Sequence, residues 1–170
     1  MTEPGPREAA KIVETAGGRI VGRTRLQKVG CLLELAGARH GFKFAYHLFG
    51  PYSERLNIAA SDAEALDLFD VEECVASWGG RYSIYKMAAH SADEITSSLR
   101  TIAKTAADAD SIELELAVTA AFLAANGVEA PWEEVAALKK SKATSDRLAH
   151  AKDLYKKLAR DDLPVRLPAI

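Results

Sequence analysis

The spacing of apolar residues changes within the first 90 positions, and this change limits the folds open to the chain. Apolar residues recur at three- and four-residue steps over 24–36 and 53–69, the period of a helix that buries one face. Between these segments, four apolar residues alternate with other types, the period of a half-buried strand: Phe42, Phe44, Tyr46 and Leu48. A mixture of helices and antiparallel strands is therefore expected.

Glycine and short polar residues predict where these elements begin and end. Thr24 with Gln27 fits a capping box at a helix start, and Ser53 fits an N-cap. Gly50-Pro51 is expected to end the strand. The Trp78-Gly79-Gly80 turn joins two β-prone runs, 72–77 and 81–87, which predicts a hairpin.

The order of these elements predicts the fold class. A helix at 7–16, a short extended stretch at 20–21, a helix, a strand, a helix and a hairpin follow one another, as in a winged helix with an extended connection before its third helix. We expect an α+β, mainly helical protein with a winged-helix-like unit at 6–88.

The rest of the sequence predicts four helices packed on that unit. Capping signals at Ser91 with Glu94 and at Asp110 with Glu113 start two of them. Pro131 fits the first turn of the third, and the fourth is expected over 145–160. A helical extension at 91–160 and a tail with two prolines at 161–170 complete one expected compact body.

Composition is that of a globular chain. The 170 residues are 48% hydrophobic and 27% charged, which suits one folded domain. No apolar run reaches the roughly 18 residues that span a bilayer, and residues 1–6 lack the pattern of a secretory signal, so a cytoplasmic location is expected. Cys31 and Cys74 form neither a disulfide framework nor a metal-ligand spacing.

The net charge of -2 hides a segregation of charge. Residues 7–55 carry +5, residues 56–135 carry -11, and residues 136–170 carry +5. The predicted third helix at 52–69 and its neighbour Asp70 hold five acids and only Arg55 as a base. Because DNA-reading helices need basic or amide side chains, ordinary winged-helix docking is disfavoured.

Two groups of residues resemble a known family. The run from Gly18 to Lys28, with its Leu26-Gln27-Lys28 motif, and the turn Phe49-Gly50-Pro51-Tyr52-Ser53 resemble the YwgA-type family of small prokaryotic proteins. The stretches 114–117 and 138–142 also resemble that family's second half, whereas 82–86 departs from its usual hairpin ending. A more distant similarity is to the SocA-like or Panacea group, which includes antitoxins and a proteolytic adaptor. The resemblance implies a winged-helix-like fold and no established enzymatic chemistry.

The Gly50-Pro51-Tyr52-Ser53 turn has a structural and a functional interpretation. Structurally, proline fixes the backbone, serine caps a helix and tyrosine packs as an aromatic plug. Functionally, the turn would lie at a pocket or partner surface beside the Leu-Gln-Lys helix. The candidate residues for that surface are Gln27, Lys28, His47, Tyr52 and Arg55.

Catalysis and metal binding find little support. The histidines at 40, 47, 90 and 150 are scattered, and no phosphate loop or zinc spacing is present. His47 with Ser53 lacks an orienting acid, and Cys31 lies near the apolar face of a predicted helix. We therefore expect no catalytic residues, no metal site and no cofactor.

The leading hypothesis is a non-enzymatic binding module, regulatory or adaptor-like, that acts through protein contacts, with self-association left open. The alternative is a nucleic-acid-binding protein that uses basic segments 19–28 and 139–157. The basic candidates are Arg19, Arg23, Arg25, Lys139, Lys140, Lys152 and Lys156, although a solvated face that balances the acidic middle is the favoured interpretation of such charges. A third hypothesis, an enzyme, would require a pocket that holds His47 and Tyr52.

Overall fold

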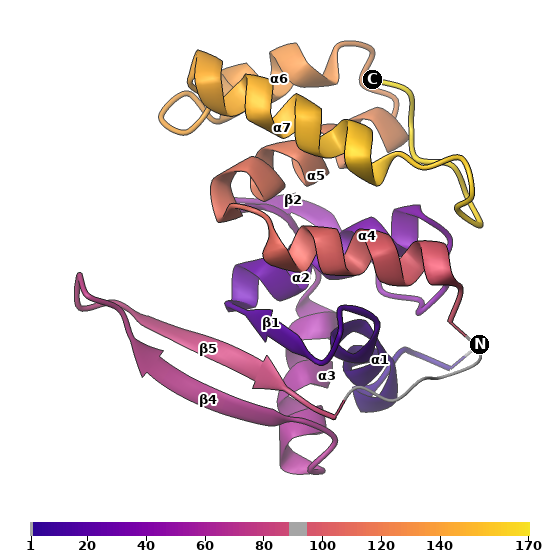
Figure 1. The fold of residues 1–170 in the computed structure, drawn as a ribbon, viewed down its shortest axis with the longest axis vertical. Helices are drawn as coiled ribbons and strands as arrows, with labels where there is room; N and C mark the ends of the chain where they lie inside the picture. Colours follow the sequence, from indigo (N-terminus) through magenta and orange to yellow (C-terminus); the bar gives the residue numbers. More distant parts are fainter. Residues whose placement is uncertain (1, 89–94) are drawn as a thin grey trace.

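A computed structural model describes residues 2–88 and 95–170 and has an α+β fold. The first part of the chain carries three helices and five strands, in the order α1 (Pro6–Thr15), β1 (Arg19–Val21), α2 (Arg23–Leu35), β2 (Ala45–His47), β3 (Gly50–Tyr52), α3 (Glu54–Ala65), β4 (Asp70–Val75) and β5 (Arg81–Lys86). The second part is helical, with α4 (Ser97–Asp108), α5 (Ser111–Ala125), α6 (Pro131–Leu138) and α7 (Ser145–Leu158). Figure 1 shows α6 and α7 at the end of the molecule opposite the β4–β5 hairpin.

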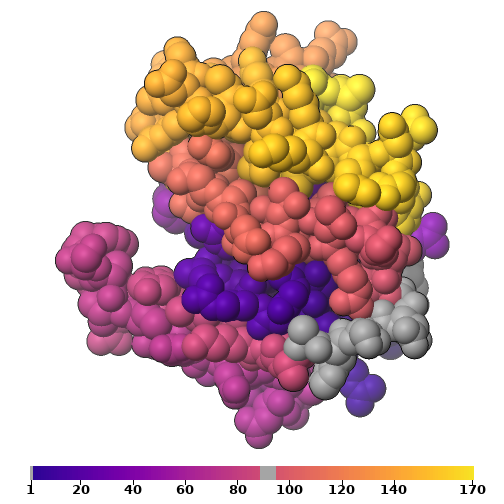
Figure 2. All heavy atoms as spheres, in the orientation of Figure 1, coloured from indigo at the N-terminus to yellow at the C-terminus, as the bar shows by residue number. Residues whose placement is uncertain are grey.

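The larger sheet is antiparallel, with strand order β1-β5-β4. Strands β4 and β5 pair from Asp70 with Lys86 to Val75 with Arg81, so the predicted hairpin is confirmed. β1 pairs only with the last part of β5, Ile84 to Lys86. Beyond that pairing the hairpin extends away from the body, and a recess separates its tip from the rest of the molecule (Figure 2).

Helix α2 lies at the centre of the molecule. Eight successive residues, Leu26 to Leu33, are buried, which means that the helix is covered on all sides rather than on one face. α1 and β1 contact it from the first half, and α4 and α5 contact it from the second. Helix α5 is covered in the same way over Leu114 to Ala121. The two helices contact each other, so polar residues on either one can be buried between the halves.

The predicted aromatic strand at 42–48 is wrong in extent and in burial. Only Ala45–His47 forms a strand, and all three residues are exposed. Gly50-Pro51 does not end the sheet but forms β3, which pairs with β2 in a separate two-stranded ribbon. Phe42 is buried, whereas Leu48 is 81% exposed. The alternating pattern wrongly indicated a half-buried strand, because Leu48 and Phe49 belong to an exposed turn at the tip of this short ribbon.

Capping signals were confirmed where the partner lies close in sequence. Ser53 accepts a hydrogen bond from Leu56 N, and Asp110 accepts from Ile112 N and Glu113 N. The capping box of Thr24 with Gln27 is wrong, because α2 begins after Gly22, whose φ is 98°, and Gln27 makes other contacts. The expected box of Ser91 with Glu94 lies outside the described residues, and α4 follows Thr96.

The predicted helix at 53–69 ends earlier than expected, at Ala65. Leu66 is exposed, while Phe69 lies beyond the helix and is buried edge-on against Tyr85. The acids of this region all face solvent: Glu54, Asp62, Glu64, Asp67 and Asp70. Over residues 2–88 and 95–170, none of the helices has the length and apolar character needed to cross a bilayer.

Candidate functional site

The Leu-Gln-Lys and Gly-Pro-Tyr-Ser motifs contact each other directly. The Gln27 side chain donates from Nε2 to Ser53 O at 3.0 Å and accepts from Ser53 N at Oε1 at 2.8 Å. Lys28 Nζ donates to Pro51 O at 2.9 Å. Helix α2 thus binds the backbone on both sides of Tyr52. These bonds satisfy the buried backbone groups of Pro51 and Ser53, where the chain passes from β3 into α3.

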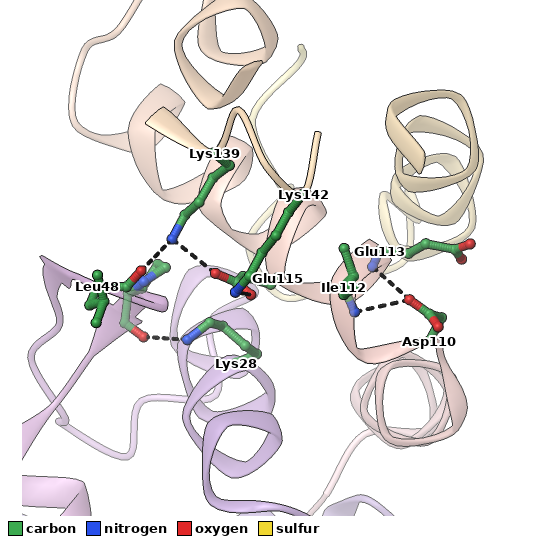
Figure 3. A network of polar contacts seen from close by, with 9 residues as sticks. Lys28, Leu48, Asp110, Ile112, Glu113, Glu115, Lys139 and Lys142 are labelled. Atoms are coloured by element: carbon green, nitrogen blue, oxygen red, sulfur yellow. Dashed lines mark hydrogen bonds and ion pairs between the residues drawn. The ribbon is translucent and has the colours of Figure 1, made fainter. Parts of the chain in front are cut away.

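Lys28 also belongs to a buried group of charges between the halves, which we call the lysine cluster: Lys28, Glu115, Lys139 and Lys142. Lys139 Nζ lies 2.9 Å from Glu115 Oε1, and Lys142 Nζ lies 2.8 Å from Oε2 (Figure 3). Lys28 is 3% exposed, Lys139 5% and Glu115 7%. Two ammonium groups therefore pair with one carboxylate that also attracts Lys28, which leaves the cluster positive.

The electrostatics of Lys28 follow from this burial. Loss of hydration lowers the pKa of Lys28 from 10.5 to about 8, Glu115 opposes the shift, and Lys139 and Lys142 add to it. Its charge is stabilised by the Pro51 carbonyl and by the nearby carboxylate. An added negative charge near this ammonium would therefore be favoured.

The lysine cluster holds the β2–β3 ribbon at β3 and at the turn that joins its two strands. Lys28 binds Pro51 O in β3, while Lys139 donates to Leu48 O at 2.7 Å (Figure 3). Lys139 and Lys142 also lie over aromatic rings of the ribbon, at 5.3 Å from the Tyr46 centroid and 4.9 Å from the Phe49 centroid. The exposed ribbon tip is thus fixed by buried charges.

Gly50 allows the ribbon to approach the body closely. Its φ is +89°, and a Cβ there would lie 2.6 Å from Thr119 Oγ1 and 3.1 Å from Lys28 Cε. Thr119 is fully buried, and its Oγ1 has no hydrogen-bond partner among the described residues. A side chain at position 50 would therefore push β3 away from both α2 and α5.

A cavity of about 400 Å³ opens beside the ribbon. Its walls come from the start of α2, the ribbon, α3 and β5, and they are formed by Arg23, Thr24, Leu26, Gln27, Lys28, His47, Leu48, Phe49, Gly50, Tyr52, Asn57, Ala60 and Tyr85. Four of the five partner or pocket candidates from the sequence line it: Gln27, Lys28, His47 and Tyr52. Its volume lies in the range of small-molecule sites.

The fifth candidate, Arg55, lies elsewhere. Its Nε donates to Pro4 O at 2.7 Å, and Glu3 lies 3.9 Å away. Arg55 therefore fixes the segment before α1 to the start of α3.

The cavity holds His47 and Tyr52 without a catalytic arrangement among the described residues. The two rings are 5.1 Å apart, and Tyr52 OH donates to Glu54 at 2.9 Å. Ser53 is buried, and its Oγ caps α3. Nucleophilic catalysis requires a nucleophile, a base and an orienting group within hydrogen-bond reach, whereas Ser53 Oγ is engaged with Leu56 N. No cluster of metal-ligand side chains occurs over 2–88 and 95–170.

The basic candidates divide into internal and exposed residues. Arg25 is half-buried and its Nη1 donates to the carbonyls of Ala107 and Ala109 at the end of α4. Lys139 belongs to the lysine cluster. Arg23 contacts Ser83 at 3.3 Å and Glu73 at 3.5 Å but remains 70% exposed. The other four side chains are exposed: Arg19, Lys140, Lys152 and Lys156.

Two buried polar residues near the ribbon were not predicted from the sequence. Glu115 and Thr119 lie in α5, where each occupies a position between apolar neighbours. A charged residue within the otherwise apolar run 114–121 was an available signal, because an unpaired buried carboxylate is costly.

Comparison with family models, with curated proteins and with solved structures gave no match for this chain.

Proposed function

We propose that this protein is a non-enzymatic, regulatory or adaptor-like binding module that docks a protein partner on the tip of the β2–β3 ribbon. The observation that carries the proposal is the exposure of two large apolar side chains on a rigidly held turn. Leu48 is 81% and Phe49 50% exposed, while buried lysines fix the carbonyls of Leu48 and Pro51. Preorganised apolar anchors cost little entropy on binding.

The charge beside this tip favours an acidic partner. Lys142 Nζ lies over the Phe49 ring, and its side chain is 30% exposed. A partner segment with an apolar anchor and flanking Asp or Glu would bury Leu48 and Phe49 and pair with Lys142. Charge complementarity of this kind contributes both specificity and rate of association.

We also propose that the first half is winged-helix-like and related to the YwgA-type family. The strand order β1-β5-β4 with a terminal hairpin supports this fold. The bonds from Gln27 to Ser53 and from Lys28 to Pro51 support the resemblance, because they give the two shared motifs one common role.

Site-specific photocrosslinking tests the partner proposal. A benzoylphenylalanine placed at Phe49 should crosslink a defined protein in cells, whereas the same group at Lys157, exposed on α7, should not. Leu48→Ser, combined with the crosslinker at 49, should reduce the yield because it removes the exposed anchor.

Two results would overturn the proposal. One is equal crosslinking from positions 49 and 157, which would indicate chance encounters. The other is the absence of any crosslinked protein together with turnover of a small molecule by the purified chain.

Nucleic-acid binding is the second candidate, and the five exposed basic candidates support it: Arg19, Arg23, Lys140, Lys152 and Lys156. Arg25 and Lys139 are engaged within the protein, which reduces the positive charge available for phosphate. Affinity for labelled duplex should fall steeply with salt and with charge reversal at Lys140 and Lys156 if this function holds. Unchanged duplex mobility at low salt would remove it.

A further inference from the structure

The cavity beside the ribbon combines an apolar wall with unbalanced positive charge. Leu26, Phe49 and Tyr85 supply apolar and aromatic surface, and Gln27 and Thr24 supply polar groups. No Asp or Glu among the described residues lines it, whereas Arg23 and Lys28 both do. The cavity therefore offers two formal positive charges beside a hydrophobic wall.

Neither cation is neutralised by a strong partner of its own. Arg23 pairs with Glu73 at 3.5 Å, but both side chains are at least half exposed, and pairs of that kind contribute little stability. The one carboxylate close to Lys28, Glu115, already contacts Lys139 and Lys142. A ligand anion would meet a guanidinium able to bind a carboxylate through two parallel hydrogen bonds.

Size and charge together restrict the occupant. About 400 Å³ accommodates a compact molecule of one or two rings or a short chain. An inorganic anion would leave the apolar wall uncovered, and a neutral hydrocarbon would leave Arg23 with only its exposed, weak pair to Glu73. The matching ligand carries one carboxylate and an apolar body.

We propose that this cavity is a binding site for a small organic carboxylate, with Arg23 binding the carboxylate and Leu26, Phe49 and Tyr85 contacting the apolar body. Lys28 contributes long-range attraction from the cavity wall. The site adjoins the ribbon tip on which a protein partner would dock, because Leu48 and Phe49 also line the cavity. The ligand site does not require the partner to exist.

The test uses the purified full-length chain and three probes: 2-naphthoate, its neutral amide 2-naphthamide, and acetate. Titration is followed by backbone amide chemical shifts of the ¹⁵N-labelled protein. We expect 2-naphthoate to cause saturable shifts at Thr24, Gln27 and Tyr85. It should bind at least about tenfold more tightly than 2-naphthamide, because charge-assisted hydrogen bonds exceed neutral ones. It should also bind at least about tenfold more tightly than acetate, because acetate has no apolar body to cover the hydrophobic wall.

Two arginine variants separate the assigned contact from general positive charge. Arg23→Gln should weaken 2-naphthoate binding about tenfold or more. Arg81→Gln is the matched control, since Arg81 is exposed and lines a neighbouring surface hollow together with Arg23 but does not line the cavity. Both positions are on the surface, so both variants should fold.

Three results would overturn the proposal: no saturable shifts at millimolar 2-naphthoate, equal affinity for the acid and its amide, or an Arg23→Gln affinity equal to that of the unsubstituted chain. Because the titration contains no partner, these failures are independent of the crosslinking result. Failure of crosslinking would likewise leave the ligand site intact.

Discussion

Gln27 and Ser53 form a reciprocal pair in which one side-chain amide satisfies both backbone groups of a residue 26 positions away. The donor distance is 3.0 Å and the acceptor distance 2.8 Å. Gln27 is 4% and Ser53 1% exposed, so water cannot replace either bond. This pair sets where the ribbon ends and α3 begins, and it therefore positions the cavity wall.

Gly50→Ala should displace the β2–β3 ribbon from α2 and α5. The new Cβ would lie 2.6 Å from Thr119 Oγ1, and alanine is disfavoured at φ +89°. We expect a loss of about 2–4 kcal/mol in the free energy of unfolding, measured by urea denaturation. Gly127→Ala is the matched control, because Gly127 has the same φ of +89° with nothing within 4 Å. It should lose only about 1 kcal/mol from the backbone. Equal losses would contradict the steric explanation.

Glu115→Gln should be the most damaging single change in the lysine cluster. It would remove the carboxylate that pairs with Lys139 and Lys142 and attracts Lys28, and an uncompensated buried charge costs about 3–5 kcal/mol. Lys142→Met removes only a partly exposed partner and should cost about 1 kcal/mol or less. Thermal unfolding at neutral pH compares the two variants. A smaller loss for Glu115→Gln than for Lys142→Met would show that the buried pair is not important.

The two thiols should react at very different rates. Burial raises the pKa of Cys31 from 9.0 to about 12, whereas Cys74 in β4 is only partly buried. Because the thiolate is the reactive form, a chromogenic disulfide reagent at pH about 8 should modify Cys74 first and Cys31 only after denaturation. Cys74→Ser should abolish the rapid phase. Rapid labelling of native Cys74→Ser protein would mean that α2 opens readily.

His40 should make the protein less stable in weak acid. Burial, with a smaller effect of Lys11, lowers the pKa of His40 from 6.5 to about 4, and Glu8 partly opposes this shift. Between these values the unfolded chain binds a proton that the folded chain does not, so stability decreases as pH falls from about 6.5 to about 4.

The His40→Gln variant checks this explanation. Urea denaturation at several pH values should show a weaker acid dependence, with a difference of about 2 kcal/mol at the acid end because the side chain is only partly buried. Above neutral pH the two proteins should differ by a constant amount. An unchanged acid slope would assign the effect to other groups.

Local patterns in the sequence predicted the elements that depend on nearby residues. The β4–β5 hairpin follows from a Gly-Gly turn between β-prone runs, and the N-caps at Ser53 and Asp110 follow from contacts two or three residues away. The strand at 42–48 was predicted incorrectly, because alternation alone does not show whether a second element covers one face. Gln27 was assigned to a local cap, although its bonds reach Ser53.

The candidate site was also predicted only in part from the sequence. Sequence analysis proposed Gln27, Lys28, His47 and Tyr52 as neighbours of one pocket, and all four line the cavity. It did not pair Lys28 and Lys139 with Glu115, because these residues lie 87 and 24 positions from it. The basic segments were treated as surface charge, whereas Lys28 and Lys139 are buried.

The sequence by itself determined the order of the helices, the hairpin and the acidic character of α3, because hydrophobic period, turn residues and charge act locally. Only the tertiary structure decided which partners the charged residues of the lysine cluster contact. Only when α5 packs on α2 does Glu115 meet lysines from both halves, and only then do buried ammonium groups hold the ribbon over the cavity. The balance between desolvation and pairing that fixes this arrangement depends on contacts far apart along the chain.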